Sequence, residues 1–218
     1  MTFIKSLALY PHLGLAYYPP DNFTWSRYNT AYFNKYKEYE TSRKYMTTTW
    51  DINKFRLNIT NKYTVGVVLD VGVGAGTFLK YRSEMYVEPH KTFGYDINPK
   101  GVEFLKSRDA FLDPYKEPDN SIECITLWDV IEHIEEPQKL LKKVKPGGFV
   151  LISTPLYDEI TYESITESKH FKPGEHLWYF TKEGLKWMLK GFDLVEESQG
   201  EMGYGRESIG TFVFKKQE

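Results

Sequence analysis

A run of alternating glycines constrains this chain more than any other feature. The sequence D-V-G-V-G-A-G occupies residues 70–76, directly after the apolar residues 65–69 and before Thr77. Glycine has no Cβ, so it permits a sharp turn and lets a ligand approach the backbone closely. A buried strand that opens through such a loop into a helix is typical of α/β proteins that hold a nucleoside cofactor. We therefore expect Gly72, Gly74 and Gly76 to shape a cofactor-binding loop.

The glycine spacing argues against a nicotinamide dinucleotide as the cofactor. The dinucleotide fingerprint reads G-x-G-x-x-G/A, and its last small residue packs the helix against the sheet. Counted from Gly72, that position holds Thr77, which is neither glycine nor alanine. Nothing else in the sequence marks a hydride-transfer site, so the sequence does not favour an NAD-type oxidoreductase.

An acid closes the next predicted strand. Residues 91–96 end in Asp96, which lies 20 residues after Gly76. In nucleoside-binding α/β folds, an acid at this place accepts hydrogen bonds from the ribose hydroxyls. Pro99 suits the first turn of a helix over residues 100–107, so Asp96 is also a candidate N-cap of that helix. The two roles are compatible, and the sequence leaves both open.

Strand and helix signals alternate from residue 65 onward. Strands are predicted over residues 65–71, 91–96, 108–112, 121–128, 149–153, 192–197 and 209–215. A helix over 138–144 ends in a K-P-G-G turn, and a helix over 181–190 begins at Thr181 and ends before Gly191. This alternation predicts a parallel sheet with right-handed crossovers, with the ligand at the carboxyl ends of the strands.

The glycine motif resembles motif I of the class I S-adenosylmethionine-dependent methyltransferases. The D-V-I-E-H sequence at 129–133 and the K-P-G-G turn at 145–148 resemble the later region of the same family. The likeness covers residues 65–155, and a weaker likeness continues through 175–181. The overall pattern looks like the ubiquinone-biosynthesis-type small-molecule methyltransferases. This resemblance implies an α/β, three-layer, Rossmann-like fold whose seven-stranded sheet is mostly parallel, with an antiparallel last strand.

The same resemblance implies S-adenosyl-L-methionine as the cofactor. The backbone of the three glycines would receive the methionyl group, and Asp96 would hold the ribose. Asp70 would order the loop, and the carbonyl of Leu127 would meet the amino group. The full set of expected cofactor-binding residues is Asp70, Gly72, Gly74, Gly76, Asp96, Ile97, Phe111, Leu112, Leu127 and Trp128.

Three histidines are candidate catalytic proton acceptors: His133, His170 and His176. A neutral imidazole near pH 7 suits this role, although each of them also has a purely structural interpretation. Asp129, Glu132 and His133 would share one face of a helix and, with a downstream histidine, could bind a divalent cation. A similar E-x-x-E-H sequence occurs in metal-dependent small-RNA 2′-O-methyltransferases and some quinone-ring O-methyltransferases. Many metal-free relatives keep part of it, so a metal stays an open question.

The chain divides by composition into an aromatic-rich extension, residues 1–60, and a methyltransferase domain, residues 61–218. Tyr28, Tyr32, Tyr36 and Tyr39 recur at helical spacing, which predicts either a helix packed on the core or a helical lid over the cofactor. An insertion over residues 156–180 is expected to wall the acceptor site with Tyr157, Tyr162, His170, Phe171, Trp178 and Tyr179.

Charge and composition argue against some classes of binding partner and indicate a cellular compartment. The net charge of −2 makes a large nucleic-acid footprint unlikely, and no segment predicts a membrane span or a signal sequence. The single cysteine, Cys124, fits a reducing compartment, which predicts a cytoplasmic protein. Enzymes that methylate amino groups of DNA adenine and protein glutamine carry an acidic or amide residue followed by Pro-Pro-aromatic at the end of the fourth strand. Here that place reads L-W-D-V, residues 127–130, which argues against those two activities.

We therefore expect S-adenosylmethionine-dependent O- or N-methylation of a small-molecule acceptor. Two alternatives stay open: a methyltransferase acting on RNA or protein, and a non-catalytic cofactor-binding protein of the same fold.

Overall fold

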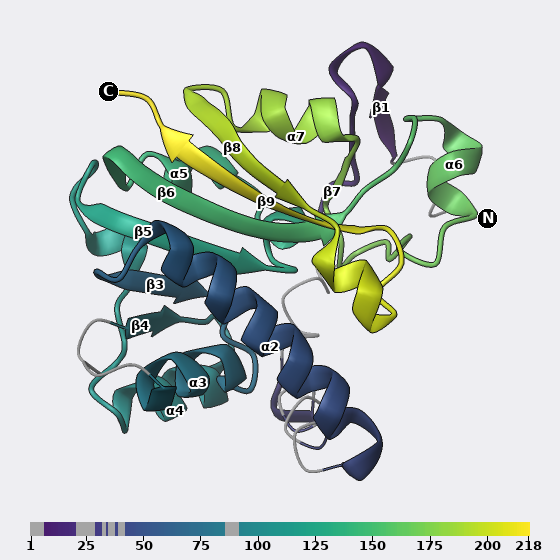
Figure 1. Ribbon diagram of the computed structural model, residues 1–218. Coiled ribbons are helices and arrows are strands. Elements are labelled where there is room, and N and C mark those ends of the chain that lie inside the picture. Colours follow the sequence, from purple (N-terminus) through teal and green to yellow (C-terminus); the bar gives the residue numbers. More distant parts are fainter. Residues whose placement is uncertain (1–6, 21–28, 32–33, 35–37, 39–41, 86–91) are drawn as a thin grey trace.

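The computed structural model of the protein describes residues 7–20, 29–31, 34, 38, 42–85 and 92–218. Its main sheet has six strands in the order β4-β3-β5-β6-β9-β8 (Figure 1). These strands are β3 (Val68–Val71), β4 (Thr92–Tyr95), β5 (Ile122–Trp128), β6 (Val144–Pro155), β8 (Phe192–Ser198) and β9 (Ile209–Lys216). The four strands β4, β3, β5 and β6 are parallel, and β9 runs antiparallel to both β6 and β8. The predicted Rossmann-like architecture is confirmed.

One predicted strand is missing, so the main sheet has six strands and not seven. Residues 108–112 contribute only an isolated bridge between Phe111 and Gly94 at the outer side of β4. Asp109 adopts a left-handed backbone with φ 52°, and the side chain of Asp113 accepts a hydrogen bond from Tyr115 N at the start of the next turn. Because these two local structures bracket the extended piece, it is too short to form a ladder.

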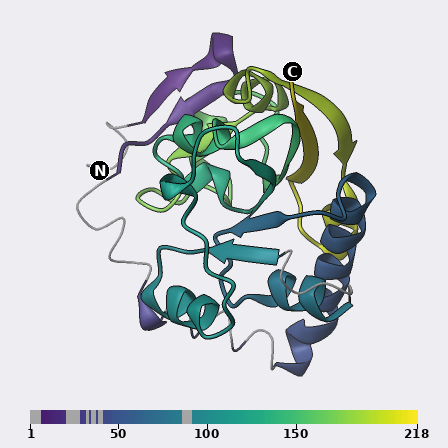
Figure 2. The same ribbon diagram turned by 90° about the vertical axis from the view of Figure 1, so that its left-hand side faces the viewer.

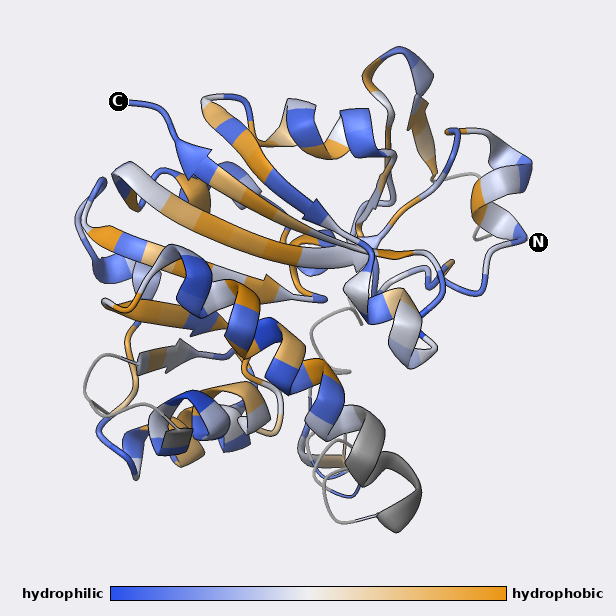
Figure 3. Ribbon diagram, viewed as in Figure 1, coloured by the Kyte–Doolittle hydropathy of each residue, from blue (hydrophilic) through white to orange (hydrophobic). Residues whose placement is uncertain are grey.

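Helices cover both faces of the main sheet. The long helix α2 (Arg43–Tyr63) lies across one face, where Leu57 and Ile59 pack against Val68, Cys124 and Leu151 (Figure 1). On the other face lie α5 (Pro137–Leu141) and α7 (Lys182–Met188), which pack with both β5 and β6. The central strands are the most apolar part of the ribbon (Figure 3), as expected for parallel strands buried on both faces.

Several predicted helix boundaries shift by a few residues. The helix α4 (Pro99–Lys106) has Asn98 as its N-cap, because the Asn98 side chain accepts from Lys100 N at 2.9 Å; the suggestion that Asp96 caps it is wrong. Thr181 caps α7 as expected, accepting from Gly184 N. The K-P-G-G segment does not form a separate turn, because β6 already begins at Val144. The remaining helices of the domain are α3 (Thr77–Met85) and α6 (Tyr162–Thr166).

A second, small sheet joins distant parts of the chain. Strands β1 (Ala8–Tyr10), β2 (Leu15–Tyr17) and β7 (Trp178–Phe180) pair antiparallel in that order, so an early hairpin is completed by the predicted insertion. Figure 2 shows the hairpin at the edge of the molecule, outside the main sheet. Tyr28, Tyr32, Tyr36 and Tyr39 lie outside the described residues, so the helical lid and the boundary at residue 60 stay predictions. Within the described ranges, no helix combines the length and apolarity that crossing a membrane requires.

Candidate active site

A cavity of about 640 Å³ opens at the carboxyl ends of β3, β4 and β5. Its wall is assembled from α2, the glycine loop (residues 70–76), the segment after β5, and residues 170–176 and 206–209. This is the edge at which open α/β sheets bind their ligands. The glycine loop, Asp96 and the three candidate histidines therefore line one space.

The glycines of the loop serve two different purposes. Gly72, Gly74 and Gly76 all have positive φ values, at 72°, 55° and 81°. A Cβ on Gly72 would lie 2.5 Å from Val130, and a Cβ on Gly76 would lie 2.3 Å from the Phe104 ring. A Cβ on Gly74 would meet nothing within 4 Å, and Gly74 lines the cavity. Gly72 and Gly76 thus allow close packing, while Gly74 leaves room for a ligand.

Two buried acids support the loop. The Asp96 carboxylate accepts hydrogen bonds from Gly74 N at 3.0 Å and from Asn98 N at 2.7 Å, although burial still raises its pKa. Asp70, at the end of β3, accepts from Thr126 Oγ1 at 2.7 Å. Burial raises the pKa of Asp70 to about 7, because the charged form loses its hydration. Both carboxylates line the cavity.

The other expected cofactor residues divide into two groups. Ile97 and Trp128 line the cavity, whereas Gly76, Phe111, Leu112 and Leu127 lie behind its wall. The sequence reasoning missed Tyr95 and Tyr115, which also line the cavity and whose rings lie 5.7 Å apart. Tyr115 is half-exposed, and burial raises its pKa to about 12, so it is a neutral ring on which a base could stack. The only sequence signal for Tyr115 was its position as an aromatic residue in the loop after the strand predicted over residues 108–112.

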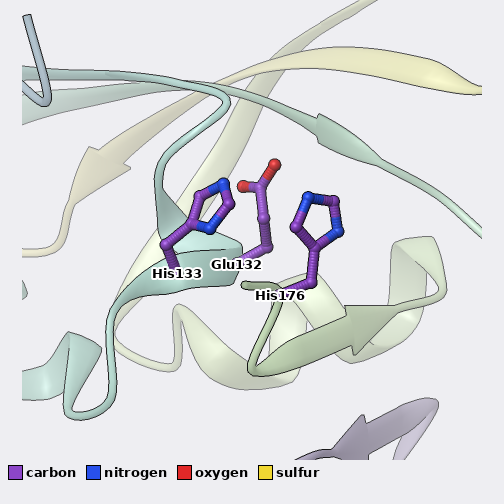
Figure 4. A group of neighbouring side chains, drawn as sticks. All are labelled: Glu132, His133 and His176. Atoms are coloured by element: carbon purple, nitrogen blue, oxygen red, sulfur yellow. The ribbon is translucent and has the colours of Figure 1, made fainter. Parts of the chain in front are cut away.

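Glu132, His133 and His176 form the histidine cluster, in which one ligand atom from each residue lies within 4.8 Å of the others. Figure 4 shows the three side chains pointing toward one another. The two imidazole rings are nearly perpendicular, with centroids 4.7 Å apart. His133 Nδ1 lies 2.6 Å from the carbonyl oxygen of Glu175. Because a carbonyl only accepts, Nδ1 carries the proton and Nε2 carries the lone pair.

Burial controls the charge of the cluster. It lowers the pKa of His133 and lowers that of His176 to about 2, so both imidazoles are neutral at pH 7. Burial also raises the pKa of Glu132, and the nearby Asp129 adds to this effect. His170 lines the same cavity but stands apart from the cluster, with its Nε2 3.1 Å from the carbonyl oxygen of Glu207.

Asp129 does not join the histidine cluster, contrary to the helix-face hypothesis. The chain after β5 forms a single 3-10 turn, η6 (Ile131–His133), and Asp129 precedes it with a φ of 59°. Its carboxylate binds Arg56 and Arg206, and these two cations lower its pKa despite the opposing effect of burial. The candidate ligand set for a cation is therefore Glu132, His133 and His176. Two imidazoles and one carboxylate form a donor set suited to a divalent metal such as zinc or iron.

The insertion walls the cavity differently from the expectation. It contributes His170, Lys172, Glu175 and His176 to the lining. Its aromatic residues Tyr157 and Tyr179, with Phe171 against them, instead pack in a separate apolar cluster beneath the small sheet. Helix α2 also lines the cavity, through Thr49, Ile52, Asn53 and Arg56. No sequence signal pointed to these residues, because the local sequence of a helix does not show which distant cavity its face will line.

A family model described as a methyltransferase domain matches residues 43–199. The chain belongs to this methyltransferase family. The match and the sheet topology confirm the predicted class I S-adenosylmethionine-dependent methyltransferase family, while the narrower likeness to ubiquinone-biosynthesis enzymes stays a prediction. No curated protein sequence matches this methyltransferase.

Solved structures share the fold of this methyltransferase at low sequence identity. The methyltransferase in a complex with the Trm112 methyltransferase activator of Haloferax volcanii has a TM-score of 0.60 and 15% identity, covering 86% of this chain and 97% of that one. A possible histamine N-methyltransferase from Thermotoga maritima has a TM-score of 0.55 and 16% identity, with the same coverage. A SAM-dependent methyltransferase from Archaeoglobus fulgidus has a TM-score of 0.53 and 20% identity, covering 85% of this chain and 100% of that one.

Proposed function

We propose that the protein transfers the methyl group of S-adenosylmethionine to a hydroxyl or amine of a small-molecule acceptor, which lies between the glycine loop and the histidine cluster. The observation that carries this proposal is the continuity of one cavity, which reaches from Gly74 and Asp96 to His176. A cavity of about 640 Å³ is within the usual range for small-molecule sites. Cofactor and acceptor can therefore share one cavity.

The chain supplies the two ends of this arrangement. Gly74, with open space at its Cβ position, gives the methionyl group access to the backbone, and Asp96 faces the cavity where the ribose would lie. Ile97 and Tyr115 offer apolar surface for the adenine. The cofactor supplies a methyl carbon already activated by the positive sulfonium. The protein's tasks are to align the acceptor atom, exclude water and receive the acceptor proton.

The histidine cluster lines the same cavity, and in this proposal the acceptor releases its proton beside it. Its neutral imidazoles suit either proton acceptance or binding of a divalent cation through Glu132, His133 and His176. We favour the cation, because the three groups already converge within 4.8 Å and Glu132 is nearly inaccessible to solvent. A bound cation would lower the pKa of an acceptor hydroxyl. His170, which lines the cavity outside the histidine cluster, would remain available as a proton acceptor.

A macromolecular acceptor is the less favoured alternative. Exposed parts of the cavity wall include Glu135 and Glu136, and the net charge of the chain is −2. Neither feature attracts the phosphate backbone of a nucleic acid. The methyltransferase in the Trm112 complex is 15% identical to this chain, so the likeness concerns the fold and does not favour a macromolecular acceptor.

The decisive test is thermal unfolding with S-adenosylhomocysteine, followed by turnover on a panel of small hydroxy and amino compounds and on total RNA. At about 100 times its dissociation constant, the ligand adds about 2.7 kcal/mol of stability, a rise in melting temperature of roughly 5–10 °C. NAD is the matched control and is expected to give no rise. Absence of a rise with S-adenosylhomocysteine, or turnover on RNA alone, would contradict the proposal.

A further inference from the structure

Two arginines and two acids meet beside the histidine cluster. Arg56 of α2 and Arg206, which follows η7 (Gly200–Tyr204), share the carboxylates of Asp129 and Glu201. Arg56 Nη2 lies 2.9 Å from Asp129, and Arg206 binds the same carboxylate through Nη1 and Nη2, both at 2.8 Å. The Glu201 side chain is fully buried and accepts from Arg56 Nε at 2.9 Å. The two positive and two negative charges therefore compensate each other.

This network holds both guanidinium groups in fixed positions. The Arg56 guanidinium lies 5.1 Å from the centroid of the Trp128 ring and also donates to Ser153 Oγ at 3.2 Å. Arg206 is fixed by its two parallel bonds to Asp129. A guanidinium that is already ordered loses little conformational entropy when it binds another group.

The same network leaves hydrogen-bond donors unused. Arg56 bonds through Nε and Nη2, and Arg206 through Nη1 and Nη2; within the described part of the chain, Arg56 Nη1 and Arg206 Nε donate to nothing. Both arginines line the cavity. This part of the wall therefore carries two guanidinium N–H groups without an acceptor among the described residues, which suits a ligand with oxygen lone pairs.

We propose that Arg56 and Arg206 bind a carboxylate of the methyl acceptor, so that the acceptor is a small hydroxy- or amino-carboxylic acid. This inference rests on the proposed function. A carboxylate can accept charge-assisted hydrogen bonds from Arg56 Nη1 and Arg206 Nε, the two guanidinium N–H groups that the network leaves unused. Since the network is already neutral, a phosphate dianion would leave two uncompensated charges in the cavity and a carboxylate only one.

The test uses matched pairs of probes that differ only in this group: salicylate with salicylamide, and lactate with lactamide. Binding to the protein saturated with S-adenosylhomocysteine is measured by calorimetry and by thermal unfolding. We expect at least one acid to bind tenfold or more tightly than its amide, the effect of one charge-assisted hydrogen bond. Equal affinities for acid and amide in the wild-type complex would overturn the inference without any variant.

Three variants show which residue causes the preference for the acid. Arg206→Gln is expected to abolish this preference, and Arg206→Lys to reduce it, because lysine keeps the charge but lacks the Nε–H donor. Lys172→Gln removes one positive charge from the same wall outside the network and is expected to keep the preference. Retention of the preference in Arg206→Gln would contradict the inference. So would a tenfold loss of S-adenosylhomocysteine affinity in that variant, because the arginines would then hold the cofactor's own carboxylate. If the wild-type protein does not bind S-adenosylhomocysteine, the proposed function fails instead.

Discussion

The Asp96 carboxylate accepts a hydrogen bond from the backbone N–H of Gly74 at 3.0 Å, which ties the end of β4 to the middle of the glycine loop. Its other oxygen accepts from Asn98 N at 2.7 Å. The acid expected to hold the ribose thus also fixes the loop expected to hold the methionyl group. A single side chain therefore sets the distance between two parts of the cofactor site.

Asp96→Ala is expected to remove most of the melting-temperature rise that S-adenosylhomocysteine produces. Charged hydrogen bonds contribute about 1.5–3 kcal/mol each, which is comparable with the whole ligand effect. Thermal unfolding with and without the ligand measures this. Asp193→Ala, on the exposed side of the edge strand β8, is the control and should keep the rise. An unchanged rise in Asp96→Ala would remove Asp96 from the ribose role.

Gly74→Ala and Gly76→Ala separate binding from packing. Both place alanine at positive φ, which costs about 1–2 kcal/mol. Only at Gly76 does the new Cβ also collide with Phe104, at 2.3 Å, and overpacking adds about 1–3 kcal/mol. Urea unfolding should show Gly76→Ala as the less stable variant. Titration with S-adenosylhomocysteine should show that Gly74→Ala loses more affinity than Gly76→Ala for each kcal/mol of stability lost. The reverse order would contradict the assignment of Gly74 to the ligand side.

His176→Ala is expected to abolish stabilisation by a divalent cation. After dialysis against EDTA, Zn²⁺ or Mn²⁺ at about 100 times the dissociation constant should add about 2.7 kcal/mol to the wild-type protein. His170→Ala is the matched control, since it removes another histidine from the same cavity outside the histidine cluster. Equal stabilisation of His176→Ala and wild type, or none in either, would remove the cation from the proposal.

Asp70 predicts a specific dependence of stability on pH. Its folded-state pKa of about 7 lies above the ordinary value of 3.8, so the folded state binds a proton that the unfolded state releases between these values. Stability therefore falls as the pH rises through this window, by about 1.4 kcal/mol per unit, and becomes flat above pH 7. Urea unfolding at pH 5 and pH 7 should show a decrease about 2–3 kcal/mol larger in wild type than in Asp70→Asn. Equal pH dependence of the two proteins would contradict the buried, proton-binding state of Asp70.

The sequence predicted the parts of the fold that depend on local patterns. The strands β3, β4, β5 and β9 appear close to their predicted places, because buried strands read as apolar runs between turn signals. The strand expected at 108–112 failed for an equally local reason, since the left-handed Asp109 and the turn capped by Asp113 leave it too short. The apolar residues of a strand were present here, but the backbone conformations at Asp109 and Asp113 prevented a longer strand.

The candidate site was less predictable where it depends on distant partners. A helical face for Asp129, Glu132 and His133 was a reasonable expectation from spacing. Asp129 is instead drawn to Arg56 and Arg206, 73 and 77 positions away, and no local pattern announces such an ion pair. The sequence contained His176 as a downstream histidine. Long-range hydrogen bonds bring it to the cluster: Leu177 N donates to Glu132 O at 2.8 Å, and Trp178 Nε1 donates to Ile134 O at 2.9 Å.

The pairing of β2 with β7 has a consequence for how the chain acquires its active site. Leu15 of β2 lies opposite Phe180 of β7, so this pairing can form only after most of the chain has been synthesised. The glycine loop and its supporting strands, by contrast, find their partners over much shorter stretches of chain. During synthesis, β3 and β4 can therefore pair before β2 meets β7, because closing the small sheet requires a much longer loop.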